Sequence, residues 1–119
     1  MSSAPSLRAH VAAAMLREGR AVELPAVGTS MRPLIPPGGV VRVEPAHAAD
    51  VRPGDVVLVD DGERLVCHRL VYIAGGRLVT RGDDMLTCDP PLPTAALLGR
   101  VPIPPSPRAL YCAVRALLR

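Results

Sequence analysis

Hydrophobic and polar positions along the chain change their period, and turn-forming residues separate the segments. Near the N-terminal end Leu7, Val11, Ala14 and Met15 recur at helical spacing, which predicts a helix over residues 6–18. Further along, short runs rich in Val, Leu and Ile alternate with clusters of Gly, Pro and Asp, which is typical of strands joined by turns. These runs predict strands at 22–24, 40–44, 56–59, 64–73, 77–80 and 97–103.

Three of these predicted strands carry more detailed expectations. Residues 56–59 are continuously apolar, which favours a strand buried on both faces. The alternation within 64–73 places His68 on a strand. The last run contains Pro102, which has no backbone N–H to donate, so we expect that strand at a sheet edge.

The composition supports one mainly β domain. The chain has 119 residues, 49% of them hydrophobic, with no Phe or Trp, so Val, Leu, Ile and Ala must fill the core. Fourteen prolines and ten glycines favour short strands and turns over a helical bundle. We therefore expect a single domain over 1–119, with its core at 21–103 and a second short helix at 108–118.

Charge and cysteine content narrow the classes of function. The net charge of +3 is spread along the chain without a basic run or stacking aromatics, so we expect no nucleic-acid partner. Three cysteines do not form a complete disulfide set, which favours a reducing, cytoplasmic location. No window approaches the roughly 18 apolar residues that a membrane-spanning helix needs, and no segment reads as a signal peptide.

Candidate chemistry lies in three segments. The segment Gly28-Thr29-Ser30-Met31-Arg32-Pro33 is followed by His68-Arg69 and then by Thr80-Arg81-Gly82-Asp83. A serine on a glycine-flanked turn, a histidine and an aspartate are the residue types of a serine hydrolase. The chain contains no lysine, so a general base must be a carboxylate or one of the three histidines, at positions 10, 47 and 68.

These segments, in this order, resemble the S24/S26 peptidase family of signal peptidases and self-cleaving repressors. The resemblance extends from about Gly28 to Val101. Because His68 precedes Arg69 where many relatives have lysine, the chain is similar to the Ser-His variant found among endoplasmic-reticulum and archaeal signal peptidases. It implies a compact, partly open barrel-like core and the activity of a serine endopeptidase, with no cofactor.

The resemblance also implies catalytic roles. Ser30 would be the nucleophile and His68 the general base. Asp83, in the Gly-Asp pair, and Asp89, six residues later, would be the acidic residues. One carboxylate would orient the imidazole while the other braces the loop, and the sequence leaves open which does which, with Asp84 as a neighbouring competitor.

The turn around the serine has two further expected roles. Gly28, Thr29 and Ser30 would form the turn whose backbone amides stabilise an oxyanion. Met31, Leu34 and Ile35 would line a small apolar substrate subsite, although core packing explains the same residues equally well. Ser30 has a structural alternative too, as a helix cap.

A metal site is not expected. Cys67, His68 and Cys88 are metal-ligand types, but adjacent strand residues point to opposite faces and no Cys-x-x-Cys spacing occurs. The expected partner is a peptide, namely an extended leader, signal or propeptide segment of a protein. Two alternatives stay open: a catalytically idle peptide-binding module of the same fold, and a peripheral membrane signal peptidase anchored by an amphipathic helix in 106–119.

Overall fold

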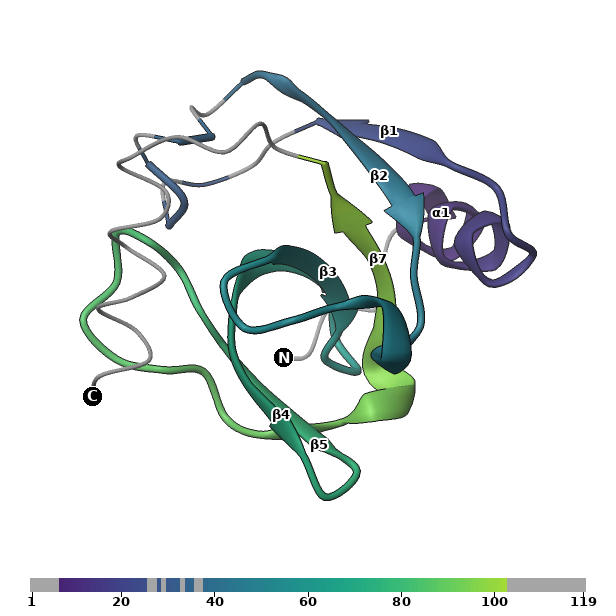
Figure 1. The fold of residues 1–119 in the computed structure, drawn as a ribbon. Coiled ribbons are helices and arrows are strands. Elements are labelled where there is room, and N and C mark those ends of the chain that lie inside the picture. The colour runs from purple at the N-terminus through teal and green to yellow at the C-terminus, as the bar shows by residue number, and fades with distance from the viewer. Residues whose placement is uncertain (1–6, 26–27, 29, 33, 36–37, 103–119) are drawn as a thin grey trace.

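The helix and strands form in the order that the hydrophobic pattern predicts. The computed structural model describes residues 7–25, 28, 30–32, 34–35 and 38–102. Figure 1 shows one helix beside a curled sheet. The elements are α1 (Leu7–Arg17), β1 (Val22–Pro25), β2 (Val40–Pro45), β3 (Val56–Asp60), β4 (Leu65–Ala74), β5 (Arg77–Arg81), β6 (Leu92–Pro93) and β7 (Leu97–Val101), with short 3-10 turns at Ala48–Asp50 and Thr94–Ala96.

The strands form one antiparallel sheet that curls into a half-barrel. Their order is β1-β2-β7-β3-β4-β5-β6. The expectations of a mainly β fold and of an N-terminal helix are confirmed. The predicted helix at 108–118 lies outside the described residues. Within the described part of the chain, no helix is long and apolar enough to cross a membrane.

The predicted edge position of the last strand is wrong. Strand β7 lies inside the sheet, between β2 and β3, and pairs with both. Pro102 does not interrupt these pairings because β7 already ends at Val101. The proline therefore follows the strand, where its missing N–H removes no ladder hydrogen bond.

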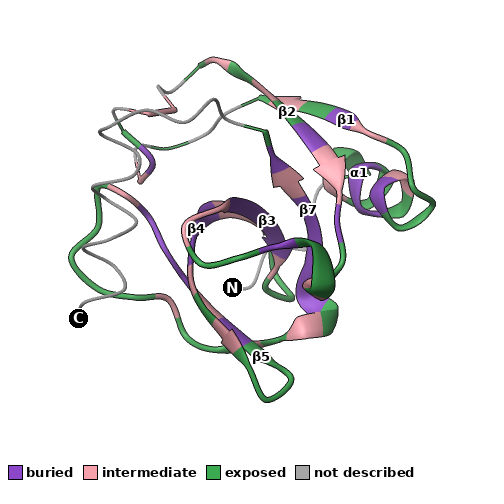
Figure 2. Ribbon diagram, viewed as in Figure 1, coloured by how far each residue is buried: buried purple, intermediate pink, exposed green. Residues whose placement is uncertain are grey.

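Two hydrophobic clusters pack on opposite faces of the sheet, and β3 contributes to both. Val56 and Leu58 belong to one cluster, whereas Val57 and Val59 belong to the other, as the two-residue period of a strand requires. All four residues are buried, so β3 is covered on both faces (Figure 2). The expectation of a doubly buried strand is confirmed.

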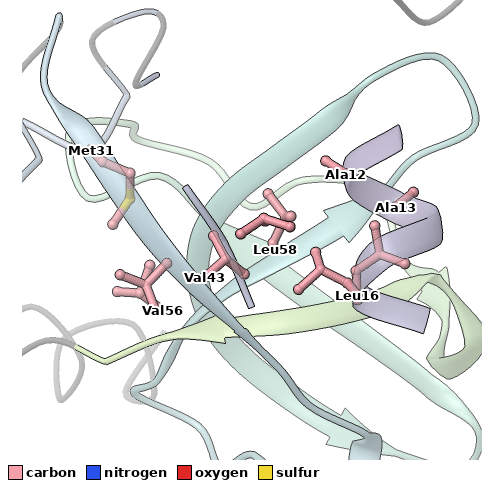
Figure 3. Close-up of a cluster of buried hydrophobic side chains, with 10 residues drawn as sticks. Ala12, Ala13, Leu16, Met31, Val43, Val56 and Leu58 are labelled. Atoms are coloured by element: carbon pink, nitrogen blue, oxygen red, sulfur yellow. The ribbon is translucent and has the colours of Figure 1, made fainter. Parts of the chain in front are cut away.

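Helix α1 covers one of these faces with small and branched side chains. Ala12, Ala13 and Leu16 are its buried residues, and they face Val43 and Leu58 of the sheet (Figure 3). The alanines allow a close approach of the helix to the strands, and burial of the apolar surface stabilises the contact. Among the described residues, α1 is the one α-helix, and it packs on this cluster.

The β4–β5 hairpin carries an irregularity that matters for the site. Its turn is Gly75-Gly76, both with positive φ, as a two-residue hairpin turn requires. Near the turn Ile73 pairs with Leu78, but the register shifts between Leu70 and Tyr72. A β-bulge of this kind inserts one extra residue into one strand and changes which residues lie opposite each other beyond it.

Candidate active site

Three side chains from distant parts of the sequence meet at one end of the half-barrel. Ser30 lies in the turn between β1 and β2, His68 lies on β4, and Asp89 lies in the loop between β5 and β6. Ser30 Oγ is 2.8 Å from His68 Nε2. His68 Nδ1, on the other side of the ring, is 2.5 Å from Asp89 Oδ2. The three groups form a continuous hydrogen-bonded series.

The imidazole tautomer follows from its two partners. A carboxylate oxygen only accepts hydrogen bonds, so the ring proton is on Nδ1 of His68, which donates a hydrogen bond to Asp89. Nε2 then carries the lone pair and accepts from the hydroxyl of Ser30. This is the arrangement in which the histidine is able to take a proton from the serine.

The sheet fixes the position of His68. The residue is buried on β4, where it pairs with Val57 of β3. Beyond the bulge, Arg69 pairs with Arg81, so continuation of the antiparallel register brings His68 opposite Gly82. The backbone of His68 is thus held by a strand with neighbours on both sides.

A buried hydroxyl and a backbone hydrogen bond hold Asp89. Thr80 Oγ1 donates to Asp89 Oδ2 at 2.7 Å, and the backbone N–H of Asp89 donates to the carbonyl of Thr80 at 2.8 Å. Thr80 is itself buried, next to last on β5. The loop that carries the carboxylate is therefore attached to the sheet at the same residue that orients it.

The serine turn is tied to the loop that follows β5. The backbone N–H of Asp84 donates to the carbonyl of Ser30 at 2.7 Å. The N–H of Asp83 donates to Met31 Sδ at 3.4 Å. Gly82 allows this approach: a Cβ atom at that position would lie 2.7 Å from the Ser30 carbonyl oxygen and 2.8 Å from Ser30 Cβ. Only glycine fits between the strand end and the serine.

The structure gives the two acidic residues different neighbours. Asp89 contacts His68, whereas Asp83 forms a two-point ion pair with Arg69, Nε to Oδ1 at 3.0 Å and Nη2 to Oδ2 at 2.7 Å. Both side chains of this pair are only 5% exposed. Arg69 Nη1 donates a hydrogen bond to the carbonyl of Gly54 at 2.8 Å. The carboxylate of Asp84 is exposed and lies 3.7 Å from Arg32.

The other predicted site residues are distributed as follows. Gly28 is exposed with φ +83°, and Thr29 lies outside the described residues. Met31 is only 5% exposed and belongs to the buried cluster under α1, against which Leu34 and Ile35 also pack. The structure therefore gives Met31 a place in the core and leaves partial exposure to Leu34 and Ile35.

Two of the three cysteines fall within the described residues. Cys67 and Cys88 are both free thiols, the first half-buried and the second exposed. Burial raises the pKa of the Cys67 thiol to about 11, an effect that the charge of Arg69 opposes and that of Asp83 reinforces. Within the described ranges, no group of three or more His, Cys, Asp or Glu side chains is placed to hold a metal ion.

Two residues at the site received no role from the sequence. Thr80 and Arg69 fall inside the quoted motifs, yet their types do not reveal their partners. The signal for Thr80 is its position two residues before Gly82 on a strand, which places both on one face. That signal becomes useful only when the register of β4 against β5 is known.

Comparison of the chain with protein-family models, with curated proteins and with solved structures finds no match. The functional interpretation therefore depends on the residues of this chain and on the distances between them.

Proposed function

We propose that this protein is a serine endopeptidase in which Ser30 is the nucleophile, His68 the general base and Asp89 the residue that orients the base. The observation that carries the proposal is the unbroken series from Ser30 Oγ through the two ring nitrogens of His68 to Asp89 Oδ2, with steps of 2.8 and 2.5 Å. A serine hydroxyl is a weak nucleophile without such a base. The structural roles of a surface serine and a strand histidine do not require this alignment.

In the first half of the reaction, Ser30 Oγ attacks the carbonyl carbon of a peptide bond while its proton passes to His68 Nε2. The backbone N–H of Ser30 is the donor that we assign to the oxyanion that develops. The carboxylate of Asp89 stabilises the imidazolium. His68 then gives the proton to the leaving amine nitrogen, the C–N bond breaks, and the acyl group stays on Ser30.

In the second half, water replaces the amine. His68 Nε2 takes a proton from the water as its oxygen attacks the acyl carbon, and the same proton returns to Ser30 Oγ as the ester bond breaks. The product is a new carboxyl terminus and the enzyme is restored. Every proton in both halves passes through Nε2, so the scheme needs only the residues that the site contains.

The proposed family assignment is an S24/S26 core of the Ser-His variant. Its support is the order of the motifs, the curled antiparallel sheet, and the position of the serine turn beside the strand end at Gly82. The substrate class proposed with it is an extended leader, signal or propeptide segment. The free thiols of Cys67 and Cys88 support the proposal of a reducing, cytoplasmic location.

The experiment that tests the activity is covalent labelling with a fluorophosphonate, followed by intact mass. Ser30 Oγ forms a bond to phosphorus, the P–F bond breaks, fluoride leaves, and His68 takes the hydroxyl proton. We expect one label on the wild type and none on Ser30→Ala or His68→Ala. Asp89→Asn should react slowly because the amide reverses the favoured tautomer.

Asp84→Asn is the matched control, since that carboxylate is exposed and lies against Arg32 rather than His68. It should be labelled at the wild-type rate. Incubation with a synthetic peptide library then tests peptide hydrolysis, with new termini expected from the wild type and not from Ser30→Ala. An unlabelled wild type that also leaves the library intact contradicts the proposal and favours an idle peptide-binding module.

A further inference from the structure

We infer that the side chain of Met85 forms an apolar wall of the substrate subsite beside Ser30 and selects for an apolar group next to the bond that is cut. The inference rests on the proposed function, because it assigns specificity to the same nucleophile. Its evidence is separate, and consists of the placement and exposure of a side chain in the loop after β5.

The first step is proximity. A Cβ atom built on Gly82 would lie 2.8 Å from Met85 Cγ and also 2.8 Å from Ser30 Cβ. Both side chains therefore approach the same point above the end of β5. A substrate carbonyl that reaches Ser30 Oγ brings its neighbouring groups into this space, and Met85 is at its border.

The second step concerns the hydrogen bonds that hold the loop of Met85 near Ser30. The N–H of Met85 donates to the carbonyl of Gly82 at 2.9 Å, which closes a tight turn over residues 82–85. The N–H of Asp84, inside that turn, donates to the carbonyl of Ser30 at 2.7 Å. Two backbone hydrogen bonds thus set the position of Met85 relative to the nucleophile, so its proximity is a property of the main chain.

The third step is exposure. Met85 is 45% exposed, whereas Met31, on the nucleophile's own turn, is 5% exposed. An apolar side chain that lies near the nucleophile turn and still presents 45% of its surface to solvent is suited to cover a ligand. Methionine is unbranched and polarisable, and it adapts to apolar groups of different shape.

The chemistry of the Met85 side chain indicates which class of substrate group it contacts. The sulfur of a thioether is only a weak hydrogen-bond acceptor, so the side chain favours polar groups little. Contact with an alkyl group removes apolar surface from water, which stabilises binding. The neighbouring carboxylate of Asp84 points to Arg32 at the surface. We therefore assign an aliphatic side chain to the substrate residue that contacts Met85.

The test compares two phosphonofluoridates, one with a methyl and one with an octyl substituent on phosphorus. The measured quantity is the ratio of their second-order rate constants for labelling Ser30. The wild type should favour the octyl probe, and Met85→Ser should lower that ratio about tenfold, the usual effect of removing apolar contact in a pocket. Met85→Leu should keep the wild-type ratio because it restores the apolar surface.

Leu86→Ser is the matched control. Leu86 follows Met85 in the same loop and is 83% exposed, so its replacement also exchanges an exposed apolar side chain for a hydroxyl. We expect its ratio to equal that of the wild type. Equal ratios for Met85→Ser and the wild type, or no preference for octyl in the wild type, overturn the inference while leaving the activated serine intact.

Two further outcomes have distinct meanings. Failure of both probes to label the wild type, together with an intact peptide library, contradicts the proposed function itself, and with it the subsite. If Met85→Ser keeps the probe ratio but loses co-sedimentation with phosphatidylcholine–phosphatidylglycerol vesicles, the exposed side chain contacts a membrane and the inference is wrong.

Discussion

Thr80 donates its hydroxyl proton to the oxygen atom of Asp89 that also accepts from His68. The two distances are 2.7 Å from Thr80 Oγ1 and 2.5 Å from His68 Nδ1, both to Oδ2. A single carboxylate oxygen thus receives one hydrogen bond from the sheet and one from the proposed base. Thr80 is a positioning residue because it acts on the imidazole only through Asp89.

Thr80→Val removes this hydroxyl without changing the volume much. We expect the rate of fluorophosphonate labelling to fall about tenfold, as loss of one hydrogen bond to a charged group allows. The free energy of unfolding should fall by about 1 kcal/mol. Thr80→Ser keeps the hydroxyl and should restore the labelling rate, a rescue that a purely structural role would not predict. Equal labelling rates for the valine and serine variants would contradict a role of Thr80 in positioning Asp89.

Gly82→Ala tests whether the close approach of β5 to the serine turn is required. The φ angle of Gly82 is not positive, so alanine is able to adopt its backbone conformation. The new Cβ, however, would meet the Ser30 carbonyl oxygen at 2.7 Å. The turn must move, and displacement of the nucleophile should slow labelling about a hundredfold. Rates are measured by intact mass on variants whose circular dichroism matches the wild type.

Gly62→Ala is the control for this substitution. Gly62 has φ +97° and open space around its Cβ position. Alanine there should cost about 1–2 kcal/mol of stability through backbone strain, with no change in labelling. If Gly82→Ala is labelled as fast as Gly62→Ala, the close packing of Gly82 on Ser30 has no catalytic consequence.

Two buried arginines on neighbouring strands should respond in opposite ways to substitution by methionine. Arg69 is paired with the buried carboxylate of Asp83, whereas Arg81 Nη1 is buried without a partner among the described residues. Arg69→Met leaves Asp83 without its cation and should lower the free energy of unfolding by about 3–5 kcal/mol. Arg81→Met removes the buried Nη1 group from a residue only 7% exposed, and should leave stability unchanged or raise it. Urea denaturation measures both, and equal losses would contradict the assignment.

Stability should fall at alkaline pH because of Cys67. Burial raises the pKa of its thiol from 9.0 to about 11, so between these values the folded chain keeps a proton that the unfolded chain has lost. The unfolded state then binds fewer protons, and the free energy of unfolding decreases as the pH rises through this interval. Urea denaturation at several pH values should show this slope in the wild type and a smaller one in Cys67→Ala. Equal slopes would show that the thiol does not contribute.

Much of the fold follows from local patterns in the sequence. The helical spacing near the N-terminal end, the alternating strands and the apolar run at 56–59 all specify which surfaces must be buried. The last predicted strand forms as β7, but its expected edge position is wrong because Pro102 lies beyond the strand. A proline one residue beyond a strand has no effect on its pairing, and local sequence does not separate the two cases.

The choice between Asp83 and Asp89 illustrates what the sequence does not contain. In a regular hairpin, the Gly75-Gly76 turn would set Asp83 opposite His68, because Ala74 pairs with Arg77 next to the turn. The bulge around Val71 shifts the register by one residue and brings Gly82 to that place instead. A one-residue shift reverses the face of every side chain beyond it.

The sequence by itself determined the residue types of the proposed site, their order along the chain, and the absence of lysine as a general base. It also determined that His68 lies on a strand. Tertiary structure decided the partners. Asp83 lies against Arg69, Asp89 lies against His68, and Met31 is buried in the core whereas Met85 is partly exposed. The physical reason is that residue spacing specifies the face of a single strand, whereas contacts between strands depend on register. Between β4 and β5, the bulge around Val71 sets that register.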